Sequence, residues 1–132
     1  MSGHPGAGTN GGTGSDTPMM PAEFAPHERT VLCWPCREEL YGELMAEARA
    51  AHAEVARVMA SFEPVTMIAR PGRDAADAAE ACGGAVEVVE LPIDDSWFRD
   101  SGPIYVIDPD GTRVATDWVF NGWGGKFRPF TD

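Results

Sequence analysis

Three short apolar runs, separated by longer mixed segments, restrict the fold of this chain more than any other feature. They are Thr30–Trp34, Val65–Ile68 and Val86–Leu91. Each is too short for a helix, contains β-branched residues and is bounded by proline or glycine, which is typical of a buried strand. The long segments between the runs favour crossover helices over tight turns. The pattern therefore predicts a parallel sheet and an α/β fold.

The two connecting segments have the composition of helices. Residues 37–62 carry apolar side chains at steps of three and four, which predicts one long amphipathic helix with its glutamates in water. The predicted core-facing stripe consists of Leu40, Leu44, Ala48, Ala51, Val55, Val58 and Phe62. In the second segment, Asp74 is the predicted cap of an alanine-rich helix that ends at Gly83–Gly84.

After the third strand the pattern changes to that of a hairpin. Residues 102–107 and 113–120 read as two strands, and Asp108–Gly111 between them favours a tight turn. The glycine-rich segment 121–126 is expected to be a loop. The hairpin and the sheet edges would lack neighbours in these 132 residues, so we expect the isolated chain to fold poorly or to self-associate.

Charge and cysteine content exclude several classes of protein. The chain has 10 Lys and Arg against 21 Asp and Glu, a formal net charge of −11, which repels nucleic acid and anionic membranes. Such a surface attracts small cations but commonly serves only solubility.

Residues 1–19 are rich in glycine and poor in apolar side chains, which predicts a disordered tail and no signal peptide. Three cysteines, an odd number, then fit a cytoplasmic protein with reduced thiols.

The segment after the third strand carries the best candidate for a ligand site. Trp97, Arg99 and Asp100 lie at the carboxyl end of a parallel strand, where α/β sheets place ligands. A carboxylate accepts two parallel hydrogen bonds from a planar cation and an indole face stacks on it, so Asp100 and Trp97 would suit a guanidinium group. Arg99 would pair with a nearby carboxylate, and Asp95 is taken as a solvated loop charge. Alternatively, Arg99 and Asp100 form ordinary ion pairs and Trp97 belongs to the core.

The segment Cys33-Trp34-Pro35-Cys36 offers a competing function. A C-x-x-C motif between a strand and a helix is typical of a thioredoxin-like disulfide oxidoreductase, because the helix N-terminus stabilises the attacking thiolate. The later proline that usually faces such a motif is not evident, which weakens this alternative. A zinc site made of Cys33, Cys36, Cys82 and a histidine would lack an ordinary ligand spacing, so no metal is expected.

Four segments together resemble the opening of agmatine deiminases and of the related bacterial peptidyl-arginine deiminases. They are Met20–Glu28, Trp34–Pro35, Asp94–Pro103 and Phe120–Lys126, in the order and at the spacing of that family. Each motif alone is moderate evidence, whereas four in the right order are strong evidence. The resemblance covers residues 20–132, about the first third of the family's domain.

The resemblance implies both a fold and a reaction. The fold would be an α/β propeller in which five ββαβ units surround the active site. The reaction would hydrolyse a guanidinium to a ureido group with release of ammonia, converting agmatine to N-carbamoylputrescine or peptidyl-arginine to citrulline. A cysteine thiolate would attack the guanidinium carbon, a histidine would act as acid and base, and carboxylates would bind the guanidinium nitrogens. No metal or organic cofactor is implied.

Four residues of this sequence match the family's site motifs. Asp100 matches the catalytic carboxylate that binds the guanidinium, and Trp97 matches a residue that lines the pocket. Asp94 and Trp123 lie in family motifs and are taken as further substrate-binding residues. The family's cysteine, histidine and second carboxylate would lie beyond Asp132, so we expect the 132-residue chain to be inactive alone. A non-catalytic remnant is an alternative, and a homo-oligomer is compatible with the sequence.

Overall fold

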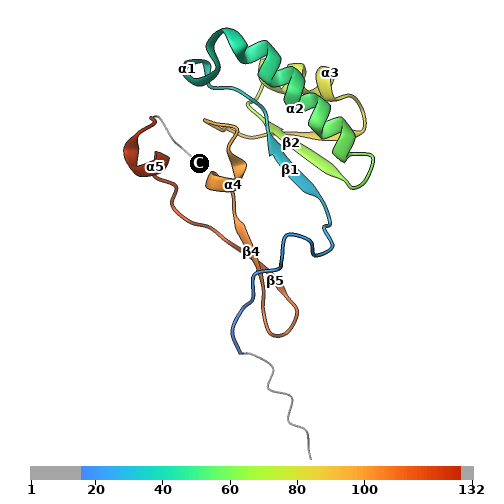
Figure 1. Ribbon diagram of the computed structural model, residues 1–132, viewed down its shortest axis with the longest axis vertical. Helices are drawn as coiled ribbons and strands as arrows, with labels where there is room; N and C mark the ends of the chain where they lie inside the picture. Colours follow the sequence, from blue (N-terminus) through green and yellow to red (C-terminus); the bar gives the residue numbers. More distant parts are fainter. Residues whose placement is uncertain (1–15, 129–132) are drawn as a thin grey trace, which may run out of the picture.

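The computed structural model describes residues 16–128 and contains the predicted parallel sheet. Strand β1 spans Thr30–Cys33, β2 spans Val65–Ala69 and β3 spans Val86–Glu90, in the order β1-β2-β3. The strand pairing starts at the first residue of each strand, so the three strands begin level with one another. Both crossovers run in the same direction, and the helices lie together above the sheet (Figure 1).

For residues 37–62, between β1 and β2, the prediction of one continuous helix is wrong. It consists of α1 (Glu38–Tyr41), a 3-10 turn η1 (Gly42–Leu44) and α2 (Met45–Met59). Gly42 has a φ of +50°, a left-handed conformation that glycine adopts more readily than other residues. The helix is therefore interrupted at this glycine, and its regular part begins only at Met45.

The face of α2 that packs on the sheet is also different from the predicted stripe. Ala53 and Ala56 are fully buried and belong to a core that includes Val65 and Met67 of β2. Alanine side chains let a helix pack close to a sheet, and this close contact takes the place of a stripe of large residues. The larger members of the predicted stripe are exposed, namely Leu40, Leu44, Val55, Val58 and Phe62.

Helix α3 (Arg73–Cys82) packs beside α2, and one arginine joins the two helices. Arg49 of α2 donates to Asp74 at 2.6 Å and to Asp77 at 2.9 Å. The predicted capping role of Asp74 is wrong, because Gly72 is the N-cap and Asp74 lies in the first turn. Its carboxylate contacts a guanidinium instead of the backbone.

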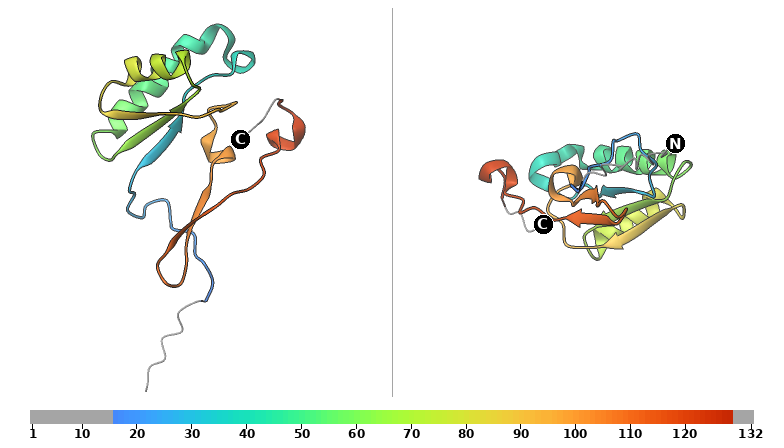
Figure 2. Two further views of the ribbon diagram at one scale, coloured as in Figure 1. Left: turned by 180° about the vertical axis from the view of Figure 1, so that it is seen from behind. Right: turned by 90° about the horizontal axis from the view of Figure 1, so that it is seen from below.

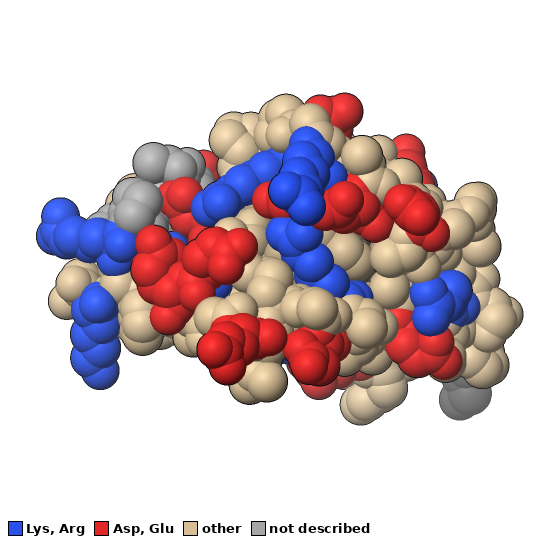
Figure 3. Space-filling view, turned by 90° about the horizontal axis from the view of Figure 1, so that it is seen from above, with Lys and Arg blue, Asp and Glu red and all other residues tan. Residues whose placement is uncertain are grey.

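Acidic and basic side chains are interspersed over the upper face of the molecule. Figure 3 shows red and blue side chains side by side there, with no large patch of one sign. Such mixing suits charges that serve solubility and local ion pairing.

The hairpin forms a second sheet that extends away from the first (Figures 1 and 2). Strands β4 (Ile104–Ile107) and β5 (Arg113–Thr116) pair antiparallel, as predicted, but both are shorter than the segments expected from the sequence. Between β3 and β4, the single-turn helix α4 (Phe98–Ser101) contacts β1. After β5, α5 (Gly122–Gly125) is one irregular turn within the predicted loop.

Most of the tail that was predicted to be disordered, residues 1–15, lies outside the described residues. Met19, the last residue of that tail, exchanges two backbone hydrogen bonds with Ile107 and so adds a bridge to the hairpin. Among residues 16–128, no helix combines the length and the apolar composition that crossing a lipid bilayer requires.

Two glutamates of the segment before β1 form ion pairs with α4 and β5. Glu23 pairs with Arg99 of α4 at 2.6 Å, and Glu28 pairs with Arg113 of β5 at 2.6 Å. Arg99 thus pairs with a carboxylate, as both interpretations of the sequence predicted. These exposed pairs connect the opening segment to both elements that flank β4.

We expect His27 to make the stability of the chain fall as the pH rises. Its Nε2 donates to the Glu23 carbonyl oxygen at 2.9 Å, and its Nδ1 lies 3.4 Å from the Glu63 carboxylate. Both contacts favour the charged imidazole and raise the pKa of His27 above its ordinary value of 6.5. Because the folded-state pKa is the raised one, the stabilising contribution is complete below pH 6.5 and is lost as the pH rises through the raised value.

The measurement is the melting temperature of the chain and of a His27→Gln variant across this pH window. The difference between the two should shrink as the pH rises. A difference that stays constant would contradict the role given to His27.

Candidate functional site

The three parallel strands end at one edge of the sheet, and the loops that leave this edge carry the candidate site. Cys36 and Arg37 follow β1, Arg70 follows β2, and residues 91–97 follow β3. Because the strands start level and have similar lengths, these three loops converge. The predicted site residues Asp94 to Asp100 lie in the third loop and in α4.

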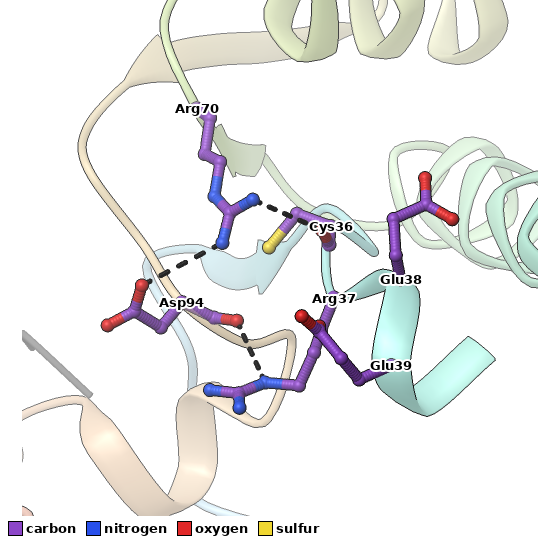
Figure 4. A pocket seen from close by; sticks show the side chains of 6 residues that line it. All are labelled: Cys36, Arg37, Glu38, Glu39, Arg70 and Asp94. Carbon is purple, nitrogen blue, oxygen red and sulfur yellow. Dashed lines mark hydrogen bonds and ion pairs between the residues drawn. The ribbon is translucent and has the colours of Figure 1, made fainter. Parts of the chain in front are cut away.

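A cavity of about 170 Å³ lies between these loops, and Asp94 is one of the residues that line it. The Asp94 carboxylate is 3.7 Å from the Arg70 guanidinium, which also donates to the Ile93 carbonyl oxygen at 2.6 Å. Arg37 donates to the Asp94 carbonyl oxygen at 3.2 Å (Figure 4). Asp94 is thus bound by two arginines of the chain, and its contact with a substrate stays a prediction. The cavity is lined by Cys36, Arg37, Glu38, Glu39, Arg70 and Asp94.

Asp95 is a buried charge, so its interpretation as a solvated loop charge is wrong. Its side chain is 6% exposed and lies 3.2 Å from Nε of Arg37, whose side chain is 7% exposed. Its other oxygen accepts a hydrogen bond from the Ser96 amide at 2.7 Å. The loop turns inward here because a buried guanidinium needs an anion beside it. The signal that sequence reasoning missed is the position of Arg37 and Arg70, each placed just after one of two adjacent strands.

Asp100 contacts the glycine-rich turn instead of the cavity. Its Oδ1 accepts a hydrogen bond from Nε1 of Trp123 at 3.3 Å, which brings together two of the predicted site residues. Within residues 16–128, Asp100 forms no ion pair, since the adjacent Arg99 pairs with Glu23. Asp100 is also exposed, so its carboxylate keeps further acceptor positions for a ligand.

Trp97 lies on the same short turn as Asp100 and is not a core residue. Its side chain is 54% exposed, and its carbonyl oxygen accepts a hydrogen bond from the Asp100 amide at 3.0 Å. The turn closes at Gly102, where a Cβ would lie only 2.6 Å from the Phe98 carbonyl oxygen. Glycine is therefore needed to hold an exposed indole and a carboxylate on one turn, an arrangement that suits a planar cation.

Trp123 has an unusual backbone conformation that its neighbours hold in place. With φ 54° and ψ 50°, it is the one non-glycine residue of the described chain in the left-handed region. Its ring packs edge-on against Phe120 and Phe127, at centroid distances of 5.0 and 5.7 Å. The Asn121 side chain accepts from the Gly124 amide at 2.8 Å and closes the turn. A bulky residue rarely adopts this conformation without such support.

The cysteines lack the properties of a redox or metal site. Cys33 and Cys36 are buried thiols. Burial raises the pKa of Cys36 to about 11, and the nearby positive charge of Arg70 opposes this only in part. A thioredoxin-like site needs the opposite shift. Burial also raises the pKa of Cys82, and in the described part of the chain no three His, Cys, Asp or Glu side chains gather in a way that could hold a metal ion.

The raised pKa of Cys36 predicts an unreactive thiol. With a pKa of about 11, roughly one thiol in ten thousand is ionised at pH 7. We therefore expect slow alkylation by iodoacetamide and no reduction of insulin disulfides. Insulin reduction that disappears in a Cys33→Ser variant would restore the thioredoxin-like alternative.

Comparison with known proteins assigns the chain to a family. The family model of the Porphyromonas-type peptidyl-arginine deiminases matches residues 19–132. The chain belongs to this family. The resemblance of the four sequence motifs to deiminases is therefore confirmed.

Individual deiminases match the same part of the chain. A relative from Streptomyces coelicolor is 51% identical over 109 residues, which cover 81% of this chain and 32% of the relative. The agmatine deiminase of Stutzerimonas stutzeri is 46% identical over 107 residues, which cover 81% of this chain and 29% of that protein. The structure of the Enterococcus faecalis agmatine deiminase superimposes with a TM-score of 0.76 at 30% identity. The superposition covers 82% of this chain and 29% of that structure. The chain thus spans about a third of the length of these deiminases and shares their mixed α/β fold.

Proposed function

We propose that residues 20–132 form the N-terminal, guanidinium-binding part of a deiminase that acts on agmatine or on peptidyl-arginine. In this reaction water replaces one nitrogen of the guanidinium carbon, a C–O bond forms, a C–N bond breaks and ammonia leaves. Agmatine would give N-carbamoylputrescine, and peptidyl-arginine would give citrulline. The attacking cysteine and the acid–base histidine would come from the part of the family domain that follows residue 132, since Cys33, Cys36 and Cys82 are buried structural thiols.

One observation carries this proposal. On a single turn, the Asp100 carboxylate has no cationic partner among the described residues, and the exposed Trp97 lies three residues before it. A guanidinium would donate two N–H groups to Asp100 and stack on Trp97, and the negative charge would offset its desolvation. Asp94 and Trp123 complete the proposed substrate-binding set. Family membership and the agmatine deiminases among the relatives support this assignment.

The same proposal extends to the setting of the enzyme. The first sheet and the hairpin would belong to an α/β propeller of five ββαβ units around a central active site. The protein would work in the cytoplasm, where its free thiols stay reduced. Its partner would be a small cationic guanidinium compound or an arginine side chain, without a metal or organic cofactor, and it would be able to form a homo-oligomer.

A chimera tests the proposed function. Residues 19–132 replace the matching segment of the Stutzerimonas stutzeri agmatine deiminase, and ammonia and ureido product are measured with agmatine and with an arginine peptide. We expect hydrolysis of at least one substrate, because the segment would supply the guanidinium-binding carboxylate. A chimera that folds but releases ammonia from neither substrate would contradict the proposal.

The matched control removes the competing redox motif. The chimera with Cys33→Ser and Cys36→Ser should keep its rate, since neither thiol takes part in the proposed chemistry. A loss of turnover without a loss of folded protein would show that the cysteines contribute to the reaction.

A further inference from the structure

We infer that Trp123 is a positioning residue for Asp100: its indole N–H fixes the plane of the carboxylate so that a guanidinium can bind with two parallel hydrogen bonds. This inference rests on the proposed function and deepens it. The contact is the 3.3 Å hydrogen bond from Nε1 of Trp123 to Oδ1 of Asp100. Asp100 lies at the end of an exposed turn, where its side chain would otherwise rotate freely.

The chemistry of the donor suits this role. An indole N–H is neutral, so it orients the carboxylate without cancelling its charge, whereas an arginine or a lysine would compete with the cationic ligand. The nearest sequence neighbour with a positive charge, Arg99, is held by Glu23 at 2.6 Å. Among residues 16–128, one oxygen of Asp100 accepts one hydrogen bond, which leaves lone pairs on both oxygens for a bidentate partner.

The backbone supports the same assignment. Trp123 occupies the left-handed region, which glycine would adopt without strain, and three of its neighbours in the turn are glycines. Phe120 and Phe127 pack edge-on against the indole and fix the direction of its N–H. A tryptophan kept in a strained position, between aromatic supports and with its one donor on the candidate carboxylate, is arranged to orient that carboxylate.

The experiment compares two ligands that differ only in the shape of the cation. Propylguanidinium offers two parallel donors in a plane, and propylammonium is a point charge that does not need an oriented carboxylate. Their dissociation constants are measured by NMR titration of the 15N-labelled chimera and of its Trp123→Phe variant, which keeps the ring and removes the N–H. The attacking cysteine of both proteins is replaced by serine, so that no ligand is hydrolysed. We expect the variant to lose roughly fivefold in affinity for propylguanidinium and to change little for propylammonium.

Trp118→Phe is the control, because Trp118 is 70% exposed and donates to Thr116 instead. It should leave both dissociation constants unchanged. Equal losses for both ligands in Trp123→Phe would indicate a merely structural role and overturn the inference, as would no loss for either.

A second measurement tests the contact itself. Asp100→Asn should shift the indole N–H resonance of Trp123, and an unmoved resonance would also overturn the inference. The measurements distinguish a failure of the proposed guanidinium site from a failure of the role of Trp123. If the chimera with Trp123 intact shows no preference for propylguanidinium over propylammonium, the guanidinium site fails and the role of Trp123 fails with it. If that preference is present and survives in Trp123→Phe, the role of Trp123 fails alone.

Discussion

Replacing Asp100 by asparagine in the chimera should lower kcat/KM for the hydrolysed substrate by at least about 100-fold. Asparagine keeps the shape of the side chain but presents an N–H donor where the guanidinium needs an acceptor. It also removes the charge that offsets desolvation of the cation. The loss of a charge-assisted bidentate contact costs on the order of 3 kcal/mol, which corresponds to about two decades in rate.

The control for this variant is Asp117→Asn, an exposed aspartate that follows β5. It changes the net charge by the same amount and should leave the rate unaltered. Melting temperatures of both variants separate binding from folding. A stable Asp100→Asn chimera with near-normal turnover would remove Asp100 from the site, and a lower melting temperature with an unchanged rate per folded molecule would make it an ordinary structural charge.

Asp95→Ala should destabilise the chain by about 3–5 kcal/mol, a loss large enough to prevent folding at moderate temperature. The reason is that Arg37 is 7% exposed and lies 3.2 Å from Asp95, so the substitution leaves a buried guanidinium without its anion. Urea unfolding followed by circular dichroism gives the free energy of unfolding. An unfolding midpoint equal to that of the unsubstituted chain would show that solvent or Asp94 replaces the lost carboxylate.

The double variant Arg37→Met with Asp95→Leu keeps the test informative if Asp95→Ala does not fold. Replacing both charges by apolar side chains removes the unpaired ion, and such replacements are commonly neutral or stabilising. We therefore expect the double variant to recover most of the stability. A double variant as unstable as Asp95→Ala would mean that the loop needs the hydrogen bond from the Ser96 amide to Asp95 more than it needs the ion pair.

The fold could be predicted from the sequence where a pattern has one physical meaning. The three apolar runs form strands as predicted, although only β2 is buried along its whole length, and their spacing required crossovers. The orientation of α2 could not be predicted in this way, because the helix has two candidate faces. Large residues such as Val55 and Val58 suggested one face, but the sheet is contacted by Ala53 and Ala56. Close packing favours small side chains at such a contact, and hydrophobic periodicity does not register that preference.

The candidate site, too, could be predicted from the sequence only in part. Trp97, Asp100 and Trp123 could be singled out from motifs, and the structure brings Asp100 and Trp123 into contact. The burial of Asp95 could not be predicted, since neighbouring carboxylates in a loop have no sequence pattern that separates a buried one from a solvated one. That burial depends on Arg37, and Arg70 binds the neighbouring Asp94; both arginines reach the loop from other strands. Contacts between distant segments of this kind become visible only when the strand order is known.

The Asp100 carboxylate, which shares a turn with the exposed Trp97, also affects the choice of denaturant. Guanidinium chloride supplies the parent ion of every proposed substrate, and at low concentration that ion would occupy the turn around Asp100 before it unfolds the chain. Mass action would then stabilise the folded state, and extrapolation from the unfolding transition would overstate the stability of the ligand-free protein. Urea has the same planar shape without the charge, so it would report the stability of the empty site.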